Sequence, residues 1–282
     1  CSSLSNIVIP DSVTAIGDYA FSHCLLLENI SIPKSVICLN GNPFSDWGGM
    51  LECLSPTFIY EDEVLFNKDK SKIVSFRNQK IESYIIPDSV TDIGDYAFSH
   101  SSLSNIVIPD SVTDIGDYAF SDCSSLTNIV IPNSVTDIGD YAFWECSSLT
   151  NIVIPDSVTD IGNSAFEYCS SLSNIVIPNS VTDIGDGAFA YCSFLSNIVI
   201  PDSVTDIGSS AFLGCSSLVK IVIPDSVTDI GVFAFEYCSS LSKIVIPDSV
   251  TNIGNGAFHG CSLSYDFRQE LISRFGEKII GL

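Results

Sequence analysis

Basic residues are scarce in this sequence. Its 282 residues include 11 Lys and Arg against 34 Asp and Glu, a formal net charge of −23. Nucleic acids and anionic membranes bind basic surfaces, so this balance argues against both as partners. Long apolar runs are also missing, and we expect no membrane insertion within this chain. The hydrophobic content of 46% is nevertheless sufficient for one elongated domain.

Catalytic signatures are equally sparse. The chain has three histidines and contains no GxSxG, GxGxxG, Walker or HExxH pattern. His23 directly precedes Cys24, which suggests a nucleophile beside a base. Adjacent residues near a turn, however, rarely reach the contact of about 3 Å that such a pair needs. We therefore expect no enzyme activity, no catalytic residues and no cofactor.

Cysteine is plentiful, but CxxC pairs and zinc-ligand spacings are absent. Only Cys38 and Cys53 stand outside one repeating position. The other nine form a column: Cys1, Cys24, Cys123, Cys146, Cys169, Cys192, Cys215, Cys238 and Cys261. A parallel ladder holds neighbouring Cβ atoms slightly too far apart for a disulfide. We expect buried free thiols that act as small hydrophobes, and no metal site.

A 23-residue repeat dominates the chain. Near-copies of LTNIVIPNSVTDIGDYAFWECSS begin at Leu103, Leu126, Leu149, Leu172, Leu195, Leu218 and Leu241. A 22-residue copy spans residues 81–102, and two more copies begin at Leu4 and Leu27. A fixed period of this length is typical of a solenoid.

One repeat predicts two strands and a turn. Residues 128–131 alternate with β-branched side chains, and Pro132 closes this first strand. Residues 135–138 predict a shorter second strand, followed by a bend at Gly139. Asp140 has the short polar side chain of an N-cap, so we expect a short helical turn after it.

Stacked repeats place like residues on like, about 4.8 Å apart along parallel ladders. In the first strand Ile129 and Ile131 point inward, so Asn128 and Val130 point outward. The sequence therefore predicts an exposed apolar stripe beside an asparagine column. Its members are Val107, Val130, Val153, Val176, Val199, Val222 and Val245.

The pattern LxxIxIPxSVxxIGxxAFxxC resembles the BspA-like leucine-rich repeats of bacterial and protist surface proteins. The match covers residues 1–37 and 81–262. The resemblance implies a β-rich, right-handed leucine-rich repeat stack with parallel β-ladders and short helical turns. We expect about twelve coils and a C-terminal helical cap. It also implies an extracellular or cell-surface location and adhesion to a host or extracellular protein.

The period divides the chain into four segments. Regular repeats occupy residues 1–37 and 87–262, and irregular coils occupy 38–86. Within the irregular segment, residues 57–60, 64–66 and 72–76 predict strands, with a β-hairpin over 64–76. Residues 263–282 predict a cap, with an amphipathic helix over 266–275. Because Cys1 already stands in the cysteine column, we expect the chain to be a fragment.

Two charged features leave alternatives open. The irregular segment holds five of the basic residues: Lys68, Lys70, Lys72, Arg77 and Lys80. It forms either a solvated hairpin or a basic contact on an acidic rod. One column of the second strand consists of Asp92, Asp114, Asp137, Asp160, Asp183, Asp206 and Asp229. It forms a solvated charged surface or attracts Ca²⁺, although calcium needs six to eight oxygens in a defined cage.

Variation between repeats concentrates around the Ala-Phe pair, at the residue before it and the two after it. These positions range from glycine to tryptophan, so a core role is excluded and exposure is predicted. Rigid, amphipathic aromatics suit binding, although turn positions can also be merely unconstrained. The predicted partner-binding residues are Tyr96, Tyr118, Tyr141, Trp144, Tyr168, Tyr191 and Tyr237.

Three hypotheses for the function remain. The first is a non-catalytic, extracellular protein-binding or adhesion module. The second is a structural stalk that presents another domain. The third is a carbohydrate-binding surface, because exposed aromatic rings can stack on sugars.

Overall fold

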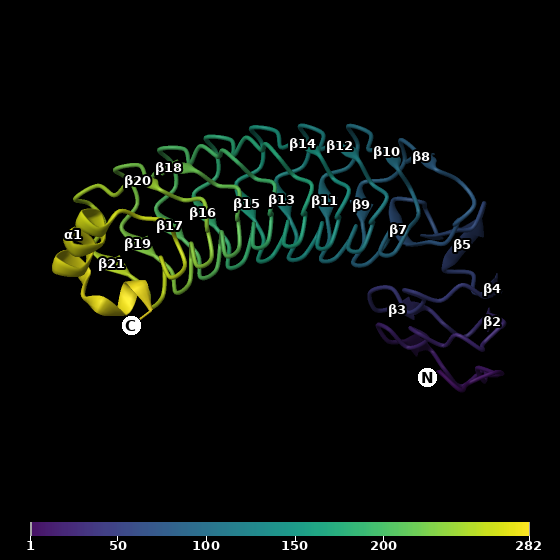
Figure 1. The fold of residues 1–282 in the computed structure, drawn as a ribbon. Helices are drawn as coiled ribbons and strands as arrows, with labels where there is room; N and C mark the ends of the chain where they lie inside the picture. The colour runs from purple at the N-terminus through teal and green to yellow at the C-terminus, as the bar shows by residue number, and fades with distance from the viewer. Residues whose placement is uncertain (1, 282) are drawn as a thin grey trace.

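The chain winds into a solenoid that bends into an arch, as a computed structural model of residues 2–281 shows (Figure 1). Each regular coil can contribute a first strand before its proline and a second, two-residue strand after it. The first strands are β2 (Asn29–Ile32), β4 (Met50–Cys53), β8 (Ser83–Ile85), β10 (Asn105–Val107), β12 (Asn128–Val130), β14 (Asn151–Val153), β18 (Lys220–Val222) and β20 (Lys243–Val245). The second strands are β1 (Ala15–Ile16), β3 (Cys38–Leu39), β9 (Asp92–Ile93), β11 (Asp114–Ile115), β13 (Asp137–Ile138), β15 (Asp160–Ile161), β16 (Asp183–Ile184), β17 (Asp206–Ile207), β19 (Asp229–Ile230) and β21 (Asn252–Ile253).

Successive coils pair in parallel and in register, as predicted. Asn128 lies opposite Asn151, and Ile138 lies opposite Ile161. The second-strand ladder is continuous from β9 to β21, whereas the first-strand ladder opens between β14 and β18. There Asn197 forms only isolated bridges with its neighbours. In Figure 1 the first strands follow the outer edge of the arch, where a bent stack spreads its coils furthest.

The predicted valine stripe is exposed on this outer ladder. Val130 is 62% exposed and Val176 is 76% exposed, while Ile129 and Ile131 are buried. The alternation of the NIVI segment therefore has the direction that the sequence predicted.

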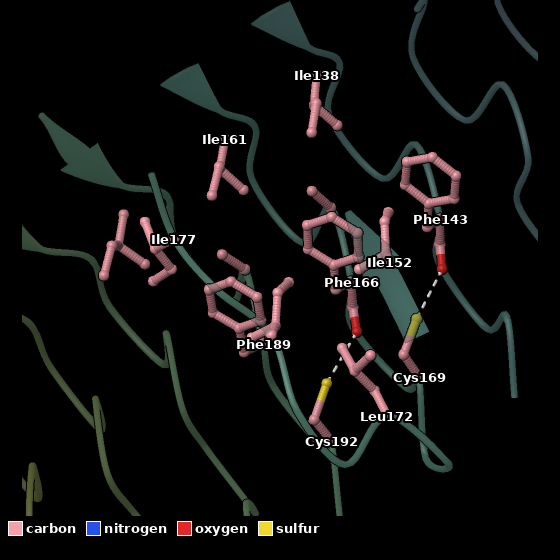
Figure 2. Close-up of a cluster of buried hydrophobic side chains, with 14 of the residues drawn as sticks. Ile138, Phe143, Ile152, Ile161, Phe166, Cys169, Leu172, Ile177, Phe189 and Cys192 are labelled. Carbon is pink, nitrogen blue, oxygen red and sulfur yellow. Dashed lines mark hydrogen bonds between the residues drawn. The ribbon is translucent and has the colours of Figure 1, made fainter. Parts of the chain in front are cut away.

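The core is a set of stacked columns. Phenylalanine rings stack with centroids 5.2–5.6 Å apart from Phe98 to Phe258. Phe166 is completely buried between Phe143 and Phe189 (Figure 2). Each coil contributes the same side chains to these columns, so the core lengthens by one layer with every repeat.

The cysteine column has a hydrogen-bonding role beyond filling space. The Cys169 thiol donates to the backbone carbonyl of Phe143 in the preceding coil, with Sγ and O 3.1 Å apart (Figure 2). The same bond joins Cys192 to the carbonyl of Phe166 at 3.2 Å. The cysteines of residues 2–281 are all free, which confirms the prediction for them; Cys1 lies outside the described residues.

The turn after each second strand corrects two expectations. No helix forms in the coils of residues 2–263, because Tyr141 and Glu145 adopt positive φ angles of 57° and 56°. Their amides therefore point along the stack: Tyr141 N–H donates to the carbonyl of Asn163 at 2.8 Å. The Asp140 carboxylate does not cap its own turn but accepts the amide of Asn163 in the next coil at 2.6 Å.

The glycine before this turn is needed for close approach between coils. Gly139 does not adopt a positive φ. A Cβ atom there would lie 2.6 Å from the backbone carbonyl carbon of Gly116 in the preceding coil. Any larger residue would push the coils apart.

The irregular segment contains a three-stranded antiparallel meander of β5 (Phe58–Glu61), β6 (Val64–Asn67) and β7 (Lys72–Phe76). β6 and β7 form the hairpin expected at residues 64–76. β7 then rejoins the solenoid, because it pairs in parallel with β9 and stacks Phe76 on Phe98 at 5.0 Å. Residues 2–281 make about ten turns rather than about twelve, since β5 and β6 double back instead of coiling.

A helix and a 3₁₀ turn cover the last coil. Helix α1 (Tyr265–Phe275) begins at Ser264, whose hydroxyl accepts the amide of Phe267, and it buries Leu271. The 3₁₀ helix η1 (Glu277–Ile280) accepts the last free turn amides: Phe258 N–H donates to the carbonyl of Ile279 at 2.9 Å. The tail therefore caps the stack, as predicted.

Candidate binding surface

Two of the three variable positions form columns along the turn edge, and the third, directly after each phenylalanine, holds Trp144. The first turn column is the residue before each Ala-Phe pair, and the second is two residues after each phenylalanine. All described members of both have positive φ. The first holds Tyr19, Tyr96, Tyr118, Tyr141, Ser164, Gly187, Ser210, Phe233 and Gly256; the second holds His23, His100, Asp122, Glu145, Tyr168, Tyr191, Gly214, Tyr237 and Gly260.

Three of the predicted residues form one stacked ladder in the first turn column. The ring centroids of Tyr96 and Tyr118 lie 4.5 Å apart, as do those of Tyr118 and Tyr141. All three side chains are half-buried, because each ring covers its neighbour. The ladder therefore presents ring edges and hydroxyls along its length. It ends at Tyr141, since the next residue in the column is Ser164.

A second aromatic group begins where the tyrosine ladder ends. Tyr168 and Tyr191 stack at 4.6 Å with an angle of 2° between their rings. Trp144 stands edge-on to Tyr168 at 6.4 Å. Tyr237 lies apart from both groups, beside His259, because Gly214 interrupts its column. The structure thus divides the seven predicted residues into two clusters and one separate tyrosine.

The backbone conformation of the tyrosines in the two columns, though not that of Trp144, reduces the stability of the fold. A left-handed conformation costs a side-chain-bearing residue on the order of 1 kcal/mol, whereas glycine adopts it freely. Gly187 and Gly214 show that both columns accept glycine. Tyrosine is nevertheless used repeatedly, so its ring must contribute something that glycine would not. Stacking supplies part of that contribution.

A shallow hollow of about 440 Å³ lies beside Tyr141. It opens because the first turn column becomes small at Ser164, Gly187 and Ser210, and Glu167 contributes a carboxylate to its wall. The sequence prediction missed this hollow because it selected the large residues of the column. The run of three small residues after Tyr141 was the available signal.

The hydroxyls of Tyr118 and Tyr19 remain protonated near neutral pH. Burial within the ladder raises the pKa of Tyr118 to about 12, and burial also raises the pKa of Tyr19 to about 12. These phenols can therefore donate hydrogen bonds to a partner and add no charge to the ladder.

The aspartate column is in register along the second strands, as predicted. Asp114 lies opposite both Asp92 and Asp137. Burial, followed by repulsion from Asp92, raises the pKa of Asp114. Thr136 donates its hydroxyl to the Asp137 carboxylate at 2.7 Å. Among residues 2–281 no group of three or more His, Cys, Asp or Glu side chains is arranged to hold a metal ion.

The basic residues of the meander are largely neutralised within the molecule. Lys72 pairs with Asp92 at 2.9 Å, Lys80 pairs with Glu63 at 2.8 Å, and Lys70 contacts Glu61. Arg77 is different, because it lies in a cavity and contacts aromatic rings. The solvated-hairpin interpretation therefore describes this region better than a basic contact surface.

The histidine next to a cysteine does not form a catalytic pair. Cys24 is buried at 1% exposure, whereas His23 is exposed and contacts the carboxylate of Asp46. His259 instead lies 3.0 Å from Glu236. Neither histidine is positioned as a base for a cysteine nucleophile.

Comparison with known families agrees with the coil geometry. The family described as "BspA type Leucine rich repeat region (6 copies)" matches this chain over residues 1–60, 72–196 and 159–279. The chain belongs to the BspA-type leucine-rich repeat family. Proteins with these repeats are generally surface or protein-interaction modules, and the repeat family and its fold are typically non-catalytic.

Solved structures place this BspA-type chain among leucine-rich repeat proteins. It is similar to one from Eubacterium ventriosum, with 28% identity and a TM-score of 0.64 over 91% of this chain and 64% of that one. It is also similar to a T. pallidum leucine-rich repeat protein, with 28% identity and a TM-score of 0.60 over 80% of this chain and 97% of that one. The pneumococcal vaccine antigen PcpA shares the fold, with 22% identity and a TM-score of 0.57 over 95% of this chain and 58% of that one.

The chain has no match among curated proteins. Within residues 2–281, no helix has both the length and the apolar character needed to span a bilayer.

Proposed function

We propose that the chain is a non-catalytic adhesion module of a surface protein, which binds an extracellular or host protein through its aromatic turn edge. The observation that carries this proposal is the repeated use of aromatic side chains at left-handed positions that also accept glycine. Tyr168 is 39% exposed and Tyr237 is 53% exposed on this edge.

The scaffold suits this role physically. Parallel ladders and buried phenylalanines hold the turn edge rigid, so little conformational entropy is lost when a partner binds there. Tyrosine and tryptophan provide large contact areas with few rotatable bonds. The net charge of −23 attracts basic surfaces, so the expected partner presents lysine or arginine around its contact site.

A glycan is the second candidate partner, and the hollow beside Tyr141 favours it. A sugar ring can stack on an aromatic face, and Glu167 and Asp186 supply carboxylates that accept sugar hydroxyls. The alternative of a purely structural stalk predicts that neither the aromatic edge nor the hollow binds anything.

The test replaces Tyr141, Trp144 and Tyr168 together with serine. Serine is native to the first turn column at Ser164 and Ser210, so the Tyr141 change is compatible with the turn. Binding is measured by surface plasmon resonance against purified extracellular matrix proteins, with a glycan array in parallel. A control variant replaces the exposed Val130, Val153 and Val176 with serine.

The proposal predicts that the aromatic variant loses at least roughly tenfold in affinity, as expected for hot-spot aromatics, with an unchanged circular dichroism spectrum. The valine variant should bind normally. A loss confined to the valine variant would place the site on the outer strands. No binding by the unmodified protein to either panel would favour the stalk.

A further inference from the structure

A cavity of about 610 Å³ lies where the chain departs from its repeat. It forms between the loop at residues 44–49, the end of β7 and the start of the regular stack. Its wall therefore consists of side chains that no other coil provides. None of the seven predicted aromatic residues lines this cavity, so a ligand site in it would be additional to the proposed function.

Arg77 is the central group of this cavity. Its guanidinium carbon lies 4.4 Å from the ring centroid of Trp47 and 5.7 Å from that of Phe44. Nη2 donates to the carbonyl oxygen of Gly49 at 2.8 Å, and Nη1 donates to that of Phe44 at 3.4 Å. Two rings and two carbonyls thus hold the guanidinium in one orientation.

Arg77 forms no direct ion pair among the described residues, because the neighbouring carboxylate of Glu63 is paired with Lys80. Tyr60 and Glu63 act favourably on the guanidinium, but burial outweighs them. The buried Nε of Arg77 also lacks a hydrogen-bond partner within residues 2–281. Burial lowers the pKa of this guanidinium, which shows how incompletely the charge is solvated. A bound anion would provide the ion pair that the Arg77 guanidinium lacks within the protein.

The cavity rim combines an ion pair with apolar groups. Lys80, whose side chain is 81% exposed, and Glu63 both line the cavity and pair with each other at 2.8 Å. Leu25 and Met50 line the cavity and are 74% and 71% exposed. The carboxylate of Asp46 also lines the cavity, but it contacts His23, as Glu63 is paired with Lys80, so neither is paired with Arg77. Charges farther along the acidic rod are screened beyond about 8 Å at physiological ionic strength.

We propose that the cavity binds a small carboxylate that carries an apolar group, of the kind found at the C-terminus of a peptide. The two carboxylate oxygens accept from the remaining Nη1 and Nη2 N–H groups of the fixed guanidinium, since Nε is buried, and the apolar group covers Leu25 and Met50. Binding would neutralise the unpaired cation without moving the loop that holds it.

The alternative is that Arg77 only fastens the loop at residues 44–49 to β7. In that case the guanidinium is already satisfied by the rings and carbonyls, and an added carboxylate gains nothing. The two cases differ in ligand binding, not in fold stability, so the test must measure binding directly.

The fluorescence of Trp47 can report ligand binding in the cavity, because its ring contacts Arg77. The sequence has two tryptophans, and Trp144→Phe leaves Trp47 alone. In this background we would titrate N-acetylleucine, its neutral amide and glucuronate while recording tryptophan fluorescence. The amide has the same apolar group without the negative charge, and glucuronate carries a carboxylate on a sugar.

The expected result is a saturable change with N-acetylleucine and none with the amide. Arg77→Lys, which loses the planar fork, should weaken binding about tenfold or more, since charge-assisted hydrogen bonds contribute about 1.5–3 kcal/mol. Lys80→Met should weaken it about threefold, in line with an exposed charge. Lys68→Met is the matched control, because Lys68 is exposed on the same meander away from the cavity, and should have no effect.

Saturation by glucuronate with the same Arg77 dependence would also support the carboxylate site and would identify a sugar acid as its source. The proposal is overturned if the amide binds as well as the acid, if no carboxylate changes the fluorescence, or if Arg77→Lys and Lys80→Met bind like the parent. Circular dichroism of each variant separates loss of binding from loss of the fold.

Discussion

The ring of Tyr19 lies edge-on against the ring of Tyr96, with centroids 4.5 Å apart and an interplanar angle of 68°. The two residues stand on opposite sides of the irregular segment 38–86. Asn42 joins the same contact, because its side-chain amide donates to the backbone carbonyl of Tyr96 at 2.9 Å. The N-terminal coils therefore rejoin the long stack along the turn edge while the meander occupies the space between their cores.

This contact predicts that Tyr19→Ala loosens the N-terminal coils. An aromatic pair contributes about 0.5–1.5 kcal/mol beyond its buried area, so opening of the junction should become about two- to tenfold more frequent. Limited proteolysis should then cleave between residues 53 and 58 correspondingly faster. Tyr237→Ala, at the other end of the stack, is the control. Equal cleavage rates for Tyr19→Ala and the parent would show that other contacts hold the junction.

Much of the fold could be predicted because the same pattern of buried and exposed residues recurs in every repeat. The alternation of the NIVI segment determines which side of the strand is buried, and the like-on-like stacking of Phe166 follows from the period alone. The turn at residues 140–145 could not be predicted in the same way. Its left-handed residues are tyrosine and glutamate. Neither residue type predicts a positive φ, whereas glycine or asparagine would.

The candidate surface was predictable only in part. Variation between copies identified Tyr96, Tyr118 and Tyr141, but it could not show that their rings cover one another. The Arg77 cavity could not be predicted from the sequence, because it depends on how a non-repeating loop folds against β7. A single copy of a segment has no internal comparison from which its contacts can be inferred.

Phe166→Ala should destabilise the rod by about 3–5 kcal/mol, because removing a fully buried ring leaves a cavity between Phe143 and Phe189. Urea unfolding followed by circular dichroism measures this loss. Val176→Ala, at an exposed position of the outer strand, should change stability by no more than about 0.5 kcal/mol. Similar losses for the two variants would contradict the stacked core.

Thiol reactivity should follow burial. Burial raises the pKa of Cys261 to about 12 and raises the pKa of Cys215 well above its ordinary value, so little thiolate forms there. In a Cys1→Ser protein, Ellman's reagent should react quickly with the exposed Cys38 and slowly with Cys53. The remaining cysteines should react only after unfolding. Rapid release of more than two equivalents from the folded protein would argue against the buried column.

The stability of the rod should depend on pH through its aspartate columns. Burial raises the pKa of Asp114 and of Asp117 in the folded protein, and nearby aspartates raise both further. A carboxyl group with a raised folded-state pKa binds more protons folded than unfolded, so the free energy of unfolding increases as pH falls through that raised value. The gain ends near the ordinary value of 3.8. Asp69 has the opposite shift, from its hydrogen bonds with Ser71, but its carboxylate is fully exposed.

The rod should therefore melt at a higher temperature at pH 4 than at pH 7, at matched ionic strength, because pH 4 lies just above the value at which the gain ends. Asparagine is native to both columns: Asn252 ends the Asp114 column, and Asn163 in the Asp117 column accepts the amide of Asp186. The double variant Asp114→Asn and Asp117→Asn should raise the melting temperature at pH 7 by about 1–2 °C, because two exposed carboxylates that repel their neighbours in the columns are removed. It should also reduce the gain in melting temperature between pH 7 and pH 4. A parent protein that instead loses stability on this mild acidification would show that ion pairs, rather than repulsion along the aspartate columns, control its charge energetics.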